Sequence, residues 1–192
     1  MENSQFNIYL TGVGGQGIGL ISEIILRAAD HAGHRVKGVD THGLAQRGGI
    51  VVSQIRMGKE IHTPLILKGQ ADLVVALERH EALRAITGAL KNGGGLVYYN
   101  TAWQPLPVRL NQEKEVNEKV ISDICSQRQI KEHRVIRQNL SNPQMQNIAV
   151  LAVIDQTSLI PGIETRHFEA AMKDLMSGEM LAKNMRLFKS TA

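Results

Sequence analysis

The stretch that best indicates the fold is FNIYLTGVGGQG, residues 6–17. Residues 6–10 are mostly apolar and favour a strand, and they run directly into the pattern G-x-G-x-x-G at 12–17. From Ile18 to Ala29 the apolar residues recur at the spacing of a half-buried helix. Gly33 follows the last of them, at the place where a glycine commonly ends a helix. We therefore predict that the chain opens as a strand, a glycine loop and a helix.

Strands and helices alternate along the rest of the sequence. The predicted strands are 35–40, 50–56, 73–77, 96–100 and 135–137. The predicted helices are 81–90, ended by the run NGGG at 92–95, then 113–130, 144–160 and one or two helices over 164–187. Such alternation is typical of a parallel sheet with right-handed crossovers. We predict an α/β, Rossmann-like, doubly wound and mostly parallel sheet with C-terminal helices. It forms a single domain over 1–192, whose helical part, about 143–190, packs on the same domain.

Composition and charge exclude several classes of protein. Of the 192 residues, 43% are hydrophobic, enough for a packed core, and the net charge of +4 is spread without a basic block, so we expect no nucleic-acid partner. The single cysteine, Cys125, excludes an internal disulfide and cannot by itself hold zinc or an iron–sulfur cluster. The longest strongly apolar run, 148–154, is much shorter than the roughly 20 residues of a membrane span, and no signal peptide is recognisable. We expect a cytoplasmic protein with no metal site of its own and no membrane partner.

The glycine loop has the context of a phosphate-binding site, because it joins a predicted strand to a predicted helix. Glycines allow a tight turn and a close backbone approach, and the first helical turn offers free N–H groups and a partial positive charge to an anion. The alternative is a tight structural turn that binds nothing. Asp40 ends the second predicted strand, the place of a ribose-binding acid in dinucleotide folds, or else it caps a helix or faces solvent. The candidate cofactor-binding residues here are Gly12, Gly14, Gly15, Gln16, Gly17 and Asp40.

A second glycine-rich loop, over 40–49, carries polar side chains of its own. Arg47 can hold a phosphate or a carboxylate through two hydrogen bonds, and His42 can donate or accept a proton near neutral pH. Gln46 lies between them, and Gly48 and Gly49 follow. The same residues equally permit a surface loop whose arginine pairs with an acid of a neighbouring subunit.

Together, GVGGQGI at 12–18 and HGLAQRGG at 42–49 resemble the gamma-type subunit of the 2-oxoacid:ferredoxin oxidoreductases. The resemblance covers roughly the whole chain. The H-G-x-x-Q-R-G-G form is most similar to the indolepyruvate ferredoxin oxidoreductase type, in which this subunit is called beta. Leu44 and Asp40 depart mildly from the family pattern, which usually has methionine and often has glutamate at these positions. Further agreement comes from 51–53, 69–73, Glu78, 81–84, Asn147, Asn184 and Phe188.

The resemblance implies an accessory catalytic subunit of a multi-subunit complex. Such a complex converts a 2-oxoacid, here indolepyruvate or another arylpyruvate, and coenzyme A into an acyl-CoA and carbon dioxide, and passes two electrons to ferredoxin. Thiamine diphosphate, Mg²⁺ and 4Fe-4S clusters are expected on a larger partner subunit, and the isolated chain is expected to be inactive, with homodimerisation possible while its interface is uncovered. By the same resemblance, the candidate catalytic residues are His42, Gln46 and Arg47, and Gly48 and Gly49 join the candidate cofactor-binding residues.

Two other functions stay open on the residues alone. The first is a free-standing NAD(P)-binding oxidoreductase, supported by the glycine pattern and Asp40 but lacking a recognisable substrate domain. The second is a nucleotide-fold module that only scaffolds a complex.

Overall fold

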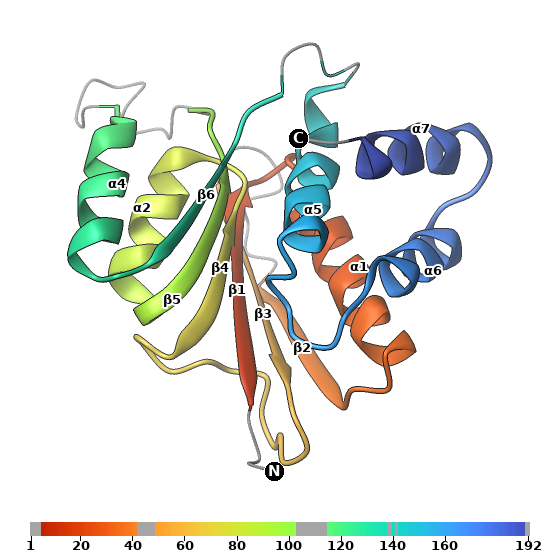
Figure 1. Cartoon of the computed structure of the whole chain (residues 1–192), viewed down its shortest axis with the longest axis horizontal. Helices are drawn as coiled ribbons and strands as arrows, with labels where there is room; N and C mark the ends of the chain where they lie inside the picture. Colours follow the sequence, from red (N-terminus) through yellow and green to blue (C-terminus); the bar gives the residue numbers. More distant parts are fainter. Residues whose placement is uncertain (1–4, 42–48, 103–114, 138–139, 141, 191–192) are drawn as a thin grey trace.

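The computed structural model describes residues 5–41, 49–102, 115–137, 140 and 142–190. In this part of the chain, the strands form one sheet with helices on both faces (Figure 1). The strands are β1 (Phe6–Val13), β2 (Val36–Thr41), β3 (Ile50–Met57), β4 (Ala71–Ala76), β5 (Leu90–Tyr99) and β6 (Lys131–Val135). The helices are α1 (Ile18–His31), α2 (Arg79–Gly88), α4 (Glu118–Gln127), α5 (Gln146–Gln156), α6 (Thr165–Leu175) and α7 (Gly178–Lys189), with a short 3-10 helix η1 (Pro143–Met145) before α5.

The sheet is mixed and mostly parallel, in the order β2-β3-β1-β4-β5-β6. Parallel pairing joins β1 to β4, β4 to β5 and β5 to β6, whereas β3 pairs antiparallel with both β1 and β2. The predicted fold class is confirmed, with one difference, the reversed strand β3. Its physical reason is the short connection from Thr41 to Ile50, because a parallel pair needs a crossover of a dozen or more residues.

Two apolar cores lie on the two faces of the sheet. Helices α1, α5 and α6 cover one face, with α7 packed beyond them, and α2 and α4 cover the other face (Figure 1). Helix α5 is buried on nearly every side, which fits its almost wholly apolar sequence. Phe168 of α6 and Phe188 of α7 pack with ring centroids 6.0 Å apart and close the outer edge of the larger core.

The predicted boundaries differ from the structure in two instructive places. The run 92–95, taken as the end of a helix, lies inside β5, where Gly93 has φ 72° and the β4–β5 register shifts between Ala71 and Leu73. Glycines occur both at irregular positions in strands and at the ends of helices, so the sequence alone does not distinguish the two. The last strand covers 131–135 rather than 135–137, because KEHRV is a charged edge strand with no apolar alternation to reveal it. No helix of the described chain is long and apolar enough to cross a membrane.

Replacing Leu151 by Ala tests the central role of α5. Leu151 is fully buried, whereas Leu67 is 78% exposed and provides a matched control of the same residue type. We expect Leu151→Ala to lower the free energy of unfolding by about 2–5 kcal/mol, because truncation removes buried apolar contacts and leaves a cavity. Leu67→Ala should change it by less than about 0.5 kcal/mol. Urea denaturation of both variants measures the difference, and equal effects would contradict this account of the core.

Candidate functional site

The glycine loop lies at the carboxyl end of β1, which is flanked by β3 on one side and β4 on the other. Gly17 is the N-cap of α1, and neither a capping side chain nor an acidic residue occupies the first turn of this helix. The first N–H groups of a helix have no partners within the helix, and the aligned peptide dipoles give this end a partial positive charge. Among the described residues, no side chain caps this end of α1, which has the chemistry to receive an anion.

Gly17 is required for two reasons. Its φ of 83° lies in the left-handed region that disfavours residues with a side chain. A Cβ on Gly17 would also stand 2.5 Å from Nδ2 of Asn147, which donates a hydrogen bond to the carbonyl oxygen of Gly17 at 3.3 Å. Asn147 is buried near the start of α5. The loop is thus packed against a helix that lies far away in sequence.

The side chain of Gln16 is turned into the protein beneath the loop. Its side chain is fully buried, Oε1 accepts from the backbone N–H of Val13 at 2.7 Å, and Nε2 donates to the carbonyl oxygen of Leu77 at 3.0 Å. A Cβ on Gly12 would stand 2.8 Å from this Oε1, so Gly12 makes room for the carboxamide. Both residues therefore shape the loop from inside the protein, and their predicted roles in binding a cofactor stay predictions.

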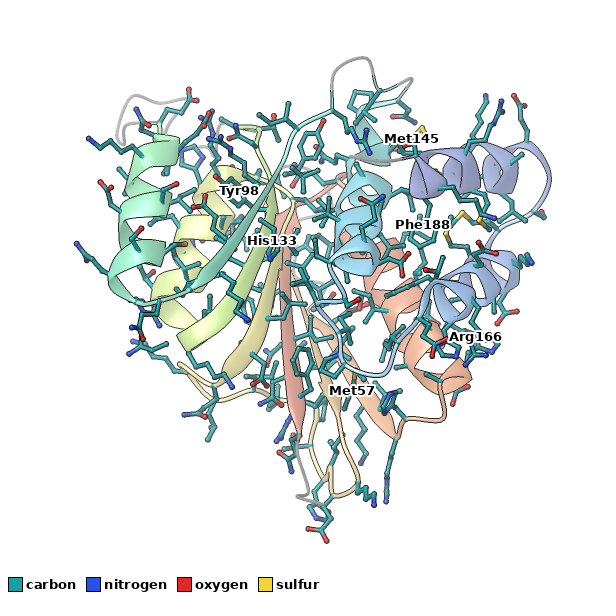
Figure 2. All side chains as sticks on the ribbon, viewed as in Figure 1. Met57, Tyr98, His133, Met145, Arg166 and Phe188 are labelled. Atoms are coloured by element: carbon teal, nitrogen blue, oxygen red, sulfur yellow. The ribbon has the colours of Figure 1, made fainter. Side chains whose placement is uncertain are left out.

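A cavity of about 490 Å³ opens directly over the loop and the first turn of α1. We call it the loop cavity; its lining includes Gly14, Gly15, Gly17 and Gly19, with Val51 of β3. An adjoining hollow of about 440 Å³, the outer cavity, adds Glu179 and Lys183 of α7. The two cavities share Asn142, Met145, Met180 and Asn184, and Met145 lies between the start of α5 and α7 (Figure 2). Together they form one groove with the start of α1 inside and the Lys183–Glu179 ion pair outside.

Sequence reasoning missed most of this far wall. Asn147 and Asn184 entered the prediction only through the family resemblance, and Asn142, Met145 and Met180 were not predicted as site residues. The one local signal was Asn142 before Pro143, which marks a helix start: the Asn142 side chain accepts from the backbone N–H of Gln144. Nothing in the sequence indicates which loop this helix start faces, because that is set by tertiary packing.

The last residue of the second predicted loop, Gly49, lies at the same place. The backbone N–H of Gly14 donates to the carbonyl oxygen of Gly49 at 2.8 Å, immediately beyond the paired residues Val13 and Ile50. The structure therefore brings Gly49 beside the glycine loop. His42, Gln46, Arg47 and Gly48 lie outside the described residues, and their predicted roles stay predictions.

Asp40 does not take the position expected for a ribose-binding acid. It lies on β2, and β3 separates that strand from β1. Its carboxylate accepts a hydrogen bond from Oγ of Ser22 on α1 at 3.2 Å. In a dinucleotide fold the strand with the acid lies next to the strand before the glycine loop. The inserted strand β3 thus removes the geometric support for Asp40 as a cofactor-binding residue and for the NAD(P) alternative.

Two buried acids stand behind the same edge of the sheet, on the α2 side. Glu78 caps α2 by accepting from the backbone N–H groups of His80 and Glu81, and His80 Nδ1 lies 3.0 Å from the same carboxylate. Oγ1 of Thr11 donates to Glu81 at 2.9 Å. Burial raises the pKa of Glu81, and the nearby Arg84 guanidinium opposes this shift. These groups connect β1 to the start of α2, and most of their hydrogen bonds are made to other residues of the protein.

Comparisons with known proteins point to a single family. A family model described as pyruvate ferredoxin/flavodoxin oxidoreductase matches residues 7–192. The chain is 33% identical over 199 residues to indolepyruvate oxidoreductase subunit IorB of Archaeoglobus fulgidus, covering 96% of this chain and 92% of the relative. The subunit of the same name from Thermococcus kodakarensis is 39% identical over 103 residues, which span 54% of this chain and about half (49%) of the relative. The resemblance based on the two glycine-rich segments is confirmed.

Solved structures show the same fold. The gamma subunit of a keto/oxoacid ferredoxin oxidoreductase from Geobacter sulfurreducens matches with a TM-score of 0.65 and 19% identity, covering 96% of this chain and 94% of that one. A 2-oxoglutarate:ferredoxin oxidoreductase from Magnetococcus marinus, solved with 2-oxoglutarate, coenzyme A and succinyl-CoA bound, matches with a TM-score of 0.67 and 20% identity. That match covers 97% of this chain but 30% of the other, so the fold occurs there as one part of a longer chain.

A comparison of two glycines tests the contact between the loop and α5. Gly33 has φ 76° with nothing near its missing Cβ, whereas Gly17 has φ 83° and Asn147 in the way. We expect Gly33→Ala to cost about 1–2 kcal/mol of unfolding free energy from the left-handed backbone alone. Gly17→Ala should cost about 1–3 kcal/mol more, because Asn147 must move.

The second arm of this test repeats Gly17→Ala in a chain that carries Asn147→Ala. There the extra cost should disappear, leaving a loss close to that of Gly33→Ala, as a double-mutant cycle by chemical denaturation would measure. Equal costs for Gly17→Ala and Gly33→Ala in the otherwise unchanged chain would contradict the contact.

Proposed function

The chain belongs to the pyruvate ferredoxin/flavodoxin oxidoreductase family, and we propose that it completes the active site of a larger, thiamine-diphosphate-dependent partner. In the proposed reaction a 2-oxoacid, coenzyme A and two oxidised ferredoxins give an acyl-CoA, carbon dioxide, a proton and two reduced ferredoxins. An aryl 2-oxoacid such as indolepyruvate is the proposed substrate. The similarity to subunits named indolepyruvate oxidoreductase supports this choice.

The observation that carries the proposal is the uncapped start of α1, which lines the loop cavity. Gly17 starts the helix without a capping side chain, and the buried Gln16 carboxamide holds the loop in place from the other side. Free N–H groups at such an end suit the oxygens of a phosphate. We therefore assign the loop a phosphate-bearing ligand.

Coenzyme A is the ligand that the groove favours, with thiamine diphosphate as the other candidate. The loop cavity continues past the apolar side chains of Met145 and Met180 to Lys183 in the outer cavity. The groove thus runs from a helix end, over apolar side chains, to a polar outer part. A long molecule with phosphates at one end and an apolar or amide arm fits such a groove better than a compact molecule does. The solved relative with coenzyme A bound supports the same choice.

The electron-carrying groups are proposed to belong to the partner subunit. A 4Fe-4S cluster needs four cysteine ligands, and this chain has one cysteine. That residue, Cys125, is buried, and burial together with the Glu132 carboxylate raises the pKa of its thiol to about 11, which disfavours the thiolate that metals bind. The residues present therefore do not fit a cluster. Transfer of electrons to ferredoxin is proposed to pass through the partner.

His42, Gln46 and Arg47 are proposed to face the 2-oxoacid and the acyl intermediate. The support is the position of their segment, which ends at Gly49 beside Gly14 and is followed by Val51 in the lining of the loop cavity. Arg47 can pair with a carboxylate or phosphate through two hydrogen bonds, and His42 and Gln46 can orient the reacting carbonyl.

Gly19 provides a sharp test of the anion site. It lies in the first turn of α1, lines the loop cavity, and has nothing within 4 Å of the position of a Cβ. We expect Gly19→Glu to raise the apparent KM for coenzyme A at least about tenfold above that of Gly19→Gln, since the two side chains differ chiefly in charge. The measurement uses the complex reconstituted with each variant chain.

The stability of the two variants provides the control. Both should unfold at or above the temperature of the original chain, because leaving glycine favours the helix and an acid suits its first turn. Equal KM values for the two variants would contradict an anion at this helix end. An effect on thiamine diphosphate activation instead of coenzyme A would assign the loop to the other candidate.

Arg47 tests the proposed role of the second loop. Arg47→Ala should lower kcat/KM for the 2-oxoacid by about 100-fold, the effect of losing a two-point contact to a charged group, while assembly with the partner is unchanged. Arg35→Ala, at an exposed position before β2, is the matched control and should leave turnover unchanged. Unchanged kinetics for Arg47→Ala would refute the assignment.

A further inference from the structure

The glycine run at 93–95 lies in an interior strand, where glycine is unfavourable unless something approaches the backbone closely. Gly93 needs its positive φ, and a Cβ on Gly94 would stand 2.9 Å from the backbone oxygen of Asp72. Gly95 needs neither a positive φ nor room for a close backbone oxygen. Its φ is ordinary, and its nearest neighbour would be the flexible end of Leu73 at 3.2 Å. The missing side chain at 95 instead leaves a hollow.

That hollow is a cavity of about 360 Å³ near the amino ends of the parallel strands, whereas the glycine loop lies at their carboxyl ends. We call it the lower cavity. Gly95 pairs with Leu73 of β4 on one side and with Lys131 of β6 on the other, so these three residues form its floor. Ser158 and Leu159, which follow α5, form one wall.

The charges around the lower cavity favour an anion. Lys91 forms an ion pair with Asp72, which neutralises both. The Lys131 side chain makes no ion pair or hydrogen bond with the part of the chain that the structure describes. His133, two residues further along β6 and labelled in Figure 2, faces the same side, and its imidazole likewise has no hydrogen-bond partner among the described residues. The cavity therefore presents one uncompensated positive charge beside a half-buried imidazole.

The rest of the lining is apolar or weakly polar. Phe6 and Leu159 are partly buried against the larger core and present carbon surface to the cavity, and Leu73 is buried beneath them. A bare inorganic ion would leave this surface in contact with water. An anion that carries a small apolar group would cover it and gain the free energy of apolar burial.

We propose that the lower cavity binds a small organic acid, with its carboxylate on Lys131 and His133 and its apolar part against Phe6 and Leu159. Neither glycine-rich segment that carries the family resemblance contributes to this site. The proposal stands on the cavity, on the missing side chain at Gly95 and on the free Lys131, and it does not depend on the ligand of the glycine loop.

The electrostatics of His133 provide a direct reporter. Burial and the nearby Lys131 both lower the pKa of this imidazole. A carboxylate placed between them would favour the charged ring and raise the pKa of His133 back toward its ordinary value. A neutral molecule of the same shape would not.

The experiment follows the full-length chain by NMR while phenylacetate is added, with phenylacetamide as the neutral probe of the same shape. We expect saturable shifts of the Gly95, Lys131 and Ser158 amides with phenylacetate, together with a rise in the pKa of His133. Phenylacetamide should bind at least about tenfold more weakly, as should phenylacetate to Lys131→Met, because each lacks one half of the charged pair. Lys119→Met, which removes an exposed lysine from α4, is the matched control and should bind like the original chain.

Three results would overturn the proposal. One is the absence of saturable shifts at the lower cavity with phenylacetate. Another is equal binding of the acid and the amide, since the site would then not recognise charge. The last is unchanged affinity in Lys131→Met. Lys131 is exposed, so this variant is expected to fold, and its spectrum verifies this directly.

Discussion

The buried carboxamide of Gln16 fixes the geometry on which the glycine loop depends. Its two hydrogen bonds join the end of β1, at Val13, to the residue after β4, at Leu77. Because both bonds lie in a site without access to water, losing either would leave a buried polar group without a partner. The carboxamide, one residue before Gly17 at the start of α1, therefore holds the end of β1 in place and explains why Gly12 must be small.

Asn147 extends this constraint to the C-terminal half of the chain. By donating to Gly17 it ties the start of α5 to the start of α1, two helix ends that are separated by most of the sequence. The far wall of the groove is formed by η1 and α7, which pack around α5. The phosphate site we propose thus depends on two halves of the fold, and the C-terminal helices belong to its construction as much as the loop does.

Local patterns predict the parts of this protein that depend on local chemistry. Strand β1, the glycine loop and α1 follow from apolar spacing and from the backbone freedom of glycine, and the mostly parallel sheet follows from the alternation of elements. Residues set by long-range packing could not be predicted: the inward-facing Gln16, the position of Asp40 behind β3, and the groove wall at Asn142 and Met180. A run of glycines does not by itself indicate which structure it belongs to. The pattern at 92–95 predicted the end of a helix, whereas these residues lie in β5 and their glycines line the lower cavity.

The reversed strand β3 limits how sequences of this kind can vary in length. Its antiparallel register places Val51 opposite Gly12 and Ile50 opposite Val13, so that Gly49 meets Gly14. A single residue inserted within β3 would turn Ser53, Ile55 and Met57 from the core to the other face of the sheet. Insertions and deletions between the two glycine-rich segments are therefore expected in the α1–β2 connection, while β1, β2 and β3 must keep their length for this register to form.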